Sequence, residues 1–129
     1  MQFSNFMDTY PTFTFTLAKA GSRFTSVEEI IAELKAKISA NPTACFIADF
    51  DHYAHTKSLP DGEIAEDISA AQSVVFCFGI KRPSAQAMAP RPRSLNVCEL
   101  PDSFVVTFMQ APNPKMTEVM QEWVKALAE

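Results

Sequence analysis

Glycine is scarce in this chain, with only three in 129 residues. That scarcity argues against a phosphate-binding loop and against a nucleophile elbow, because both motifs place several glycines at fixed spacing. Long apolar runs are also missing, since no stretch approaches the roughly 20 residues that a membrane-spanning helix needs. The N-terminal segment lacks the basic and apolar regions of a signal peptide. We therefore expect a cytoplasmic protein with no membrane partner.

Positive charge is in short supply as well. The chain has 11 lysines and arginines against 15 aspartates and glutamates, and its formal net charge is −4. Binding to nucleic acid needs a clustered basic face, usually on a basic domain. The composition therefore argues against a nucleic-acid partner, although a small anion remains a possible ligand.

The length and the apolar content predict one domain over residues 1–129. Two domains of this total length would each bury too little surface to be stable. Hydrophobic residues make up 47% of the chain and charged residues 20%, which is typical of a folded globular protein. The three cysteines are an odd number without paired spacing, and we expect Cys45, Cys77 and Cys98 to be buried, reduced thiols.

Apolar periodicity predicts five strands and two main helices. Alternating or continuous apolar residues predict strands over 12–17, 44–50, 74–80, 94–100 and 103–110. Helical spacing predicts one helix from Val27 to before Asn41 and another that begins at Asn113-Pro114. Ser26 and Glu29 have the form of a capping box for the first of these. Ile64, Ile68 and Ala71 indicate a short helix or turn.

This order of elements predicts an α+β fold. We expect a two-layer sandwich, in which a five-stranded, mainly antiparallel sheet carries the two main helices on one face. Phenylalanines two or four residues apart would point to the helices, namely Phe13 with Phe15, Phe46 with Phe50, Phe76 with Phe78, and Phe104 with Phe108. The opposite face would carry the smaller apolar residues Cys45, Ile47, Val75, Cys77, Val105 and Met109. Either the chain's own loops cover that face, or it is the contact of a homodimer.

The segment FDHYAHT, from Phe50 to Thr56, holds both histidines of the chain. It follows a predicted strand, and Asp51 would cap a helical turn that points His52 and His55 to similar sides. Histidine beside carboxylates and Tyr53 can bind a ligand or act as a general acid or base near neutral pH. A metal site would need further convergent ligands, which one His-x-x-His does not supply. A purely structural role at the end of the sheet is the other alternative.

The loop KRPSAQAMAPRPRS is the second candidate site. It spans Lys81 to Ser94 and holds three of the chain's four arginines, Arg82, Arg91 and Arg93, among three prolines. Prolines stiffen a loop, and a guanidinium is a planar donor suited to carboxylate or phosphate. The sequence predicts an anion site here, and surface ion pairing is the alternative.

Three segments, FDHYAHT, VVFCFG and RPRS, together give the chain a family resemblance. It resembles a family of small bacterial proteins of unknown function, from the first strand to the tryptophan-bearing final helix. The resemblance implies a stand-alone bacterial domain and brings no activity, cofactor or catalytic residue with it.

These observations predict a small binding domain that forms a homodimer. A small anionic or polar ligand would be held by His52, Tyr53 and His55 together with the arginines of the loop, Arg82, Arg91 and Arg93. An enzyme with a histidine general acid or base is one alternative, and a metal-binding protein is another. The sequence leaves open whether the histidines and the arginines converge, and it leaves any cofactor unknown.

Overall fold

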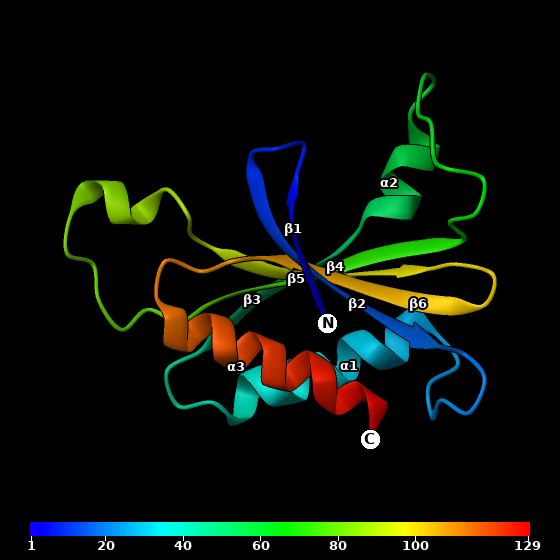
Figure 1. Cartoon of the computed structure of the whole chain (residues 1–129). Coiled ribbons are helices and arrows are strands. Elements are labelled where there is room, and N and C mark those ends of the chain that lie inside the picture. The colour runs from blue at the N-terminus through cyan, green and yellow to red at the C-terminus, as the bar shows by residue number, and fades with distance from the viewer.

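A computed structural model of residues 1–129 shows one antiparallel sheet of six strands with three helices (Figure 1). The strands are β1 Gln2–Phe6, β2 Tyr10–Ala18, β3 Cys45–Asp51, β4 Ala70–Cys77, β5 Arg93–Glu99 and β6 Ser103–Met109. The helices are α1 Val27–Ala40, α2 His52–Ser58 and α3 Pro114–Lys125, and short 3-10 turns cover Ala85–Met88 and Ala126–Ala128. The predicted α+β class is confirmed.

The sheet has one strand more than predicted. β1 forms a hairpin with β2, and its five residues are all exposed. Its sequence, QFSNF, is too short and too polar for the alternation to indicate a strand. The order across the sheet is β1-β2-β6-β5-β4-β3, so β1 and β3 are the two edge strands.

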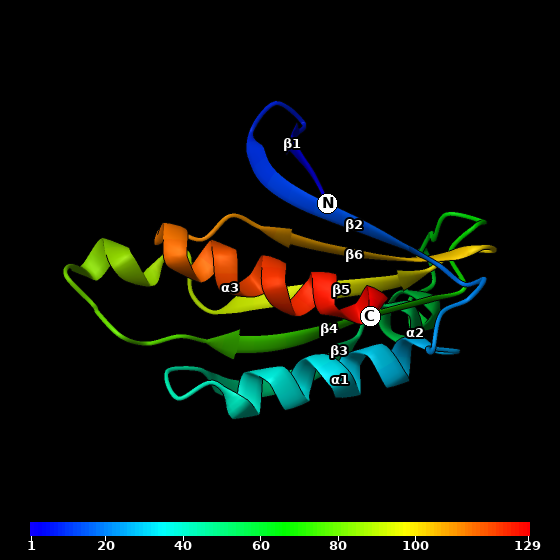
Figure 2. The same ribbon diagram turned by 60° about the horizontal axis from the view of Figure 1, so that its bottom comes forward.

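Two of the helices lie against one side of the sheet (Figures 1 and 2). α1 starts where predicted, because the Ser26 hydroxyl accepts a hydrogen bond from the Glu29 amide and caps the first turn. α3 is capped by Asn113 and has proline at its first position. The core between helices and sheet is strongly aromatic, and Trp123 contacts both Phe76 and Phe78.

The predicted faces hold for most phenylalanines but not for those in β3. Phe46 pairs with Phe76, which faces the helices, whereas Phe50 pairs with Ser73 on the opposite side. A bulge between Phe46 and Ala48 causes this difference, because one extra residue reverses the alternation of side chains. The prediction that Phe46 and Phe50 share a face is therefore wrong.

The same bulge moves Asp49. It pairs with Val74 on the helix side, where its carboxylate forms an ion pair with the Lys35 ammonium of α1 at 3.0 Å. Asp49 therefore lies on the face opposite to Cys45, which pairs with Cys77. Cys45 is also exposed rather than buried, since β3 is an edge strand, while Cys77 and Cys98 are half-buried.

The segments before β4 follow the prediction. The helical turn predicted at His52–His55 is the start of α2, and the short helix or turn predicted near Ile64 is a turn, in which the Ile68 amide donates to the Ala65 carbonyl. β4 begins at Ala70 and ends at Cys77, so the buried Phe78 lies just beyond the strand. Apolar residues alone do not separate a strand from a packed loop.

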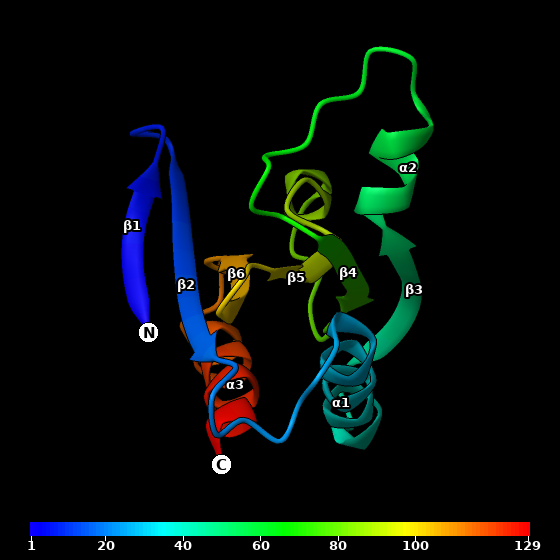
Figure 3. The ribbon, with the colours of Figure 1, turned by 90° about the vertical axis from the view of Figure 1, so that its right-hand side faces the viewer.

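The face of the sheet away from α1 and α3 carries no helix that lies flat on it. The β1–β2 hairpin and α2 both rise on that side, at opposite edges of the sheet (Figures 1 and 3). We call this side the open face. Its half-exposed apolar side chains include Val75, Val105 and Cys98. None of the helices combines the length and the apolar character of a membrane-spanning segment.

Candidate functional site

The FDHYAHT segment passes from the end of β3 directly into α2. The Asp51 carboxylate accepts a hydrogen bond from the Ala54 amide at 2.8 Å, so Asp51 caps the helix as its position in the sequence predicts. The His52 ring packs edge-on against Phe50 at 4.7 Å, and His55 lies 5.6 Å from the same ring. The helical turn thus brings both imidazoles to one phenylalanine.

His52 ends a chain of hydrogen bonds across the open face. Its Nε2 lies 2.7 Å from the Ser73 hydroxyl, which donates to Asn96 Oδ1 at 2.6 Å. The Asn96 amide nitrogen donates in turn to the Thr107 carbonyl at 2.9 Å. Because Ser73 gives its only proton to Asn96, the His52 Nε2 must be the donor to Ser73.

The direction of this network decides its chemistry. A histidine that activates a serine must accept the serine proton, whereas His52 donates to Ser73. Ser73 is also only 2% exposed, so a substrate does not reach its hydroxyl. The network satisfies the buried Ser73 of β4 and the half-buried Asn96 of β5, and it does not form a nucleophile with its base.

The segment lies at the surface, and His52 itself is exposed. His55 is exposed, and Tyr53 is half-buried under the Lys57 ammonium at 5.8 Å. No group of three histidine, cysteine, aspartate or glutamate side chains converges anywhere in the structure. His52 and His55 therefore have no third protein ligand with which to hold a metal ion.

Arg93 is a structural link in the arginine loop. Its guanidinium donates to the carbonyls of Pro90, Met109 and Gln110, and so joins the loop to the end of β6. Its Nε is buried without a hydrogen-bond partner. Burial lowers the pKa of Arg93, and the neighbouring Arg91 lowers it further.

The loop is a concentrated source of positive charge. Residues 68–98 contain Lys81, Arg82, Arg91 and Arg93 but no aspartate or glutamate, in a chain whose net charge is −4. None of these four side chains forms a salt bridge. Arg91 donates to the Ala87 carbonyl, and Arg82 donates to the Lys81 carbonyl and the Cys77 sulfur.

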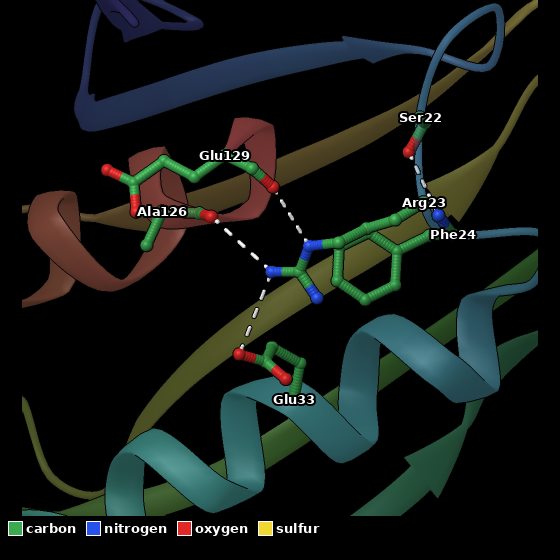
Figure 4. Close-up of polar contacts among 6 residues, drawn as sticks. All are labelled: Ser22, Arg23, Phe24, Glu33, Ala126 and Glu129. Atoms are coloured by element: carbon green, nitrogen blue, oxygen red, sulfur yellow. Dashed lines mark hydrogen bonds and ion pairs between the residues drawn. The ribbon is translucent and has the colours of Figure 1, made fainter.

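Arg23, the remaining arginine, differs from the loop arginines because it has an acidic partner (Figure 4). Its guanidinium lies 3.8 Å from the Glu33 carboxylate of α1 and donates to the carbonyl of Glu129 at 3.0 Å. It also lies over the Phe24 ring at 4.2 Å. Arg23 thus has an acidic partner and fastens the C-terminal turn to α1, whereas the loop arginines have no counter-charge.

The histidines and the loop arginines lie at opposite ends of the central strands. Asp51, just before His52, pairs with Gln72, whereas Arg93 pairs with Phe76. Four residues of strand separate these positions, which is about 13 Å. The His52 network also lies on the open face, while Phe76 faces the helices. The register of β4 therefore separates the two groups that the sequence predicts to share a ligand.

A cavity of about 290 Å³ opens beside the arginine loop. Lys81 and Arg91 line it together with three apolar side chains, Phe78, Ile80 and Met116. Asn113, the cap of α3, forms part of the wall, and its carboxamide oxygen is already bonded to the Lys115 amide at 2.9 Å. The two cationic side chains, rather than the helix terminus, are therefore the groups that remain for an anion.

The walls of this cavity share an anchor in residues 109–111. Arg93 fastens the loop to the carbonyls of Met109 and Gln110. The Thr117 hydroxyl exchanges hydrogen bonds with the main chain of Ala111, at 2.9 and 3.3 Å, and so fastens the first turn of α3.

Sequence reasoning missed the partners of His52. Ser73 and Asn96 lie on other strands, 21 and 44 residues away along the chain, and their pairing depends on strand order. Polar residues inside apolar strands were the available signal, because a buried serine or asparagine requires a partner.

The family assignment follows from a match along the whole chain. Residues 1–129 match the family of unknown function DUF6858. The chain belongs to this family. No match was found among curated proteins or among solved structures. The expected resemblance to a family of unknown function is thus confirmed, and membership in DUF6858 brings no activity with it.

Proposed function

We propose that this DUF6858 protein is a cytoplasmic binding domain for a small amphiphilic anion. The anionic group, a carboxylate or phosphate, is held by Arg91 and Lys81, and the apolar part packs on Phe78, Ile80 and Met116. The observation that carries the proposal is a set of four cationic side chains without a carboxylate partner beside a cavity.

Charge and shape both support this ligand class. An arginine without a counter-charge gains most from binding a carboxylate, because the bond is charge-assisted on both sides. The cavity volume is near the lower end of the range for ligand pockets, which is about 300–1,000 Å³. The mixed wall favours a molecule with an apolar body over inorganic phosphate. His52, Tyr53 and His55 have no part in this site.

Titration calorimetry with hexanoate and with inorganic phosphate tests the proposal. We expect hexanoate to bind more tightly than phosphate. Arg91→Gln and Lys81→Gln should each weaken hexanoate binding about tenfold, since each removes a charge-assisted contact.

Arg82→Gln is the matched control, because it removes the same charge from the same loop at a side chain that does not line the cavity. Its hexanoate affinity should stay within about twofold of the unmodified protein. Absence of binding by both probes would refute the proposal, and so would an equal loss in all three variants.

A further inference from the structure

The two edge strands of the sheet are protected to very different degrees. Each edge strand has a row of main-chain amides and carbonyls that face no neighbour, and these can pair with another chain. Proteins limit such pairing with charged side chains, prolines and bulges on the edge. β1 and β3 can be compared on these three features.

β3 carries two of the protections. A bulge interrupts its register between Phe46 and Ala48, and Asp49 and Asp51 add two negative charges. α2 follows directly from its last residue. Antiparallel pairing of β3 with a second β3 would bring these carboxylates together, which is unfavourable.

β1 carries none of them. Gln2–Phe6 contains no charged residue and no proline, and its register with β2 is uninterrupted. Asp8 is the only charged side chain in residues 1–18. All five residues of β1 are exposed, and Phe3 and Phe6 are 51% and 60% exposed.

A row of phenylalanines reaches the β1 edge from the core. Phe108 is buried, Phe13 stacks on it at 5.3 Å, and Phe3 contacts Phe13 at 5.1 Å. The burial of these rings decreases along the row, which ends at solvent. A further strand beside β1 would cover Phe3 and continue the row.

We infer that β1 is the contact of a homodimer in which two copies of this chain pair β1 with β1, antiparallel and centred on Ser4. This register joins all five residues, with Ser4 opposite Ser4 and Phe3 opposite Asn5. Self-pairing brings no like charges together, unlike at β3. Diagonal neighbours on one face of such a pair are about 7–8 Å apart, so the two Phe3 rings can meet.

The contact is small, so the dimer is weak. A five-residue strand pair with Phe3 and Phe6 lies near or below the lower limit of specific interfaces, about 1,000–1,200 Å². We expect a dissociation constant on the order of 100 µM, and the inference does not depend on the proposed ligand.

Sedimentation equilibrium with charge-swap variants tests the inference. Protein concentrations of about 10–1,000 µM bracket the expected dissociation constant. The unmodified protein should pass from one chain to two as its concentration rises. Ser4→Lys and Ser4→Glu should each weaken the dimer at least about tenfold, because like charges then lie directly opposite. An equimolar mixture of the two variants should dimerise again, which shows that both fold and that position 4 faces itself.

Ala48→Lys is the matched control, since it adds the same charge to the exposed β3 at a position on the open face. Its dimerisation should equal that of the unmodified protein. The inference is overturned by a single-chain mass at every concentration, by undiminished association of Ser4→Lys, or by loss of association in Ala48→Lys alone. The last result would place the contact on the open face or on β3.

Discussion

The two ends of the central strands hold the two candidate sites, and the polar side chains of the two sites are bonded differently. At the end where β3 meets α2, His52, Ser73 and Asn96 bond to one another. At the other end, Arg91 and Lys81 line a cavity and no carboxylate neutralises them. The histidine segment has the more suggestive sequence, but His52 already has a hydrogen-bond partner in Ser73. Capacity to bind a ligand remains where charges are unpaired.

The largest effect is expected for Arg93→Ala at the arginine end. It removes a guanidinium that donates to three carbonyls and releases the loop from the end of β6. Hydrogen bonds to charged groups are worth about 1.5–3 kcal/mol each, and part of this is regained from water. We expect the free energy of unfolding to fall by about 3 kcal/mol, measured by urea denaturation.

Arg82→Ala is the control for that experiment. Arg82 is exposed, and its guanidinium donates hydrogen bonds to the adjacent Lys81 carbonyl and to the Cys77 sulfur. Its loss should change the free energy of unfolding by no more than about 0.5 kcal/mol. Equal losses in the two variants would mean that positive charge, and not the carbonyl contacts of Arg93, stabilises the loop.

A smaller loss is expected for Ser73→Ala at the histidine end. The variant leaves Asn96 Oδ1 without its donor and removes the partner of His52. Leaving a buried acceptor unsatisfied costs about 1–3 kcal/mol, and because Asn96 is half-buried we expect about 1 kcal/mol in urea denaturation. Ser94→Ala is the control, because Ser94 lies on the same face of β5 as Asn96 and its side chain makes no hydrogen bond. This variant should leave the free energy of unfolding nearly unchanged.

Asp51→Ala should have a local effect at the same end. It removes the cap of α2, which is typically worth about 1 kcal/mol. Faster hydrogen exchange at the Ala54 amide is the expected result, with little change at α1. Unchanged exchange at Ala54 would show that packing of His52 against Phe50, and not the cap, holds the turn.

The smallest effect concerns the reactivity of thiols at the two ends. Burial raises the pKa of the Cys98 thiol, so less of it is thiolate at a given pH. Cys98 pairs with Ala71 towards the histidine end, whereas Cys45 is exposed and pairs with Cys77 near the arginine end. Iodoacetamide should modify Cys98 at least about tenfold more slowly than Cys45, as measured by mass spectrometry of peptides. Equal rates would mean that the open face at Cys98 is as accessible as the β3 edge.

Local signals in the sequence predict the helices well. The Ser26 cap and the Asn113-Pro114 start are contacts within one turn, so their residues are close in the sequence. The strands predicted over 94–100 and 103–110 are likewise close in the sequence, and they pair with each other as β5 and β6. These elements account for most of the predicted fold.

Features that depend on several strands could not be read in the same way. A bulge at Phe46/Ala48 reverses a face without any glycine or proline to mark it. β1 is stabilised by its pairing with β2, and its own composition is polar. The His52 partners and the separation of histidines from arginines follow from register across β3, β4 and β5, which composition does not encode.

The shared anchor at residues 109–111 has a mechanical consequence for the cavity. Because Arg93 holds one wall and Thr117 the other to the same short stretch, the cavity is shaped before a ligand arrives. A ligand then meets walls already in position and loses little entropy in ordering them. Residues 109–111 at the end of β6 therefore fix the width of the cavity. Substitutions in this stretch should alter the affinity for the ligand although these residues do not contact it.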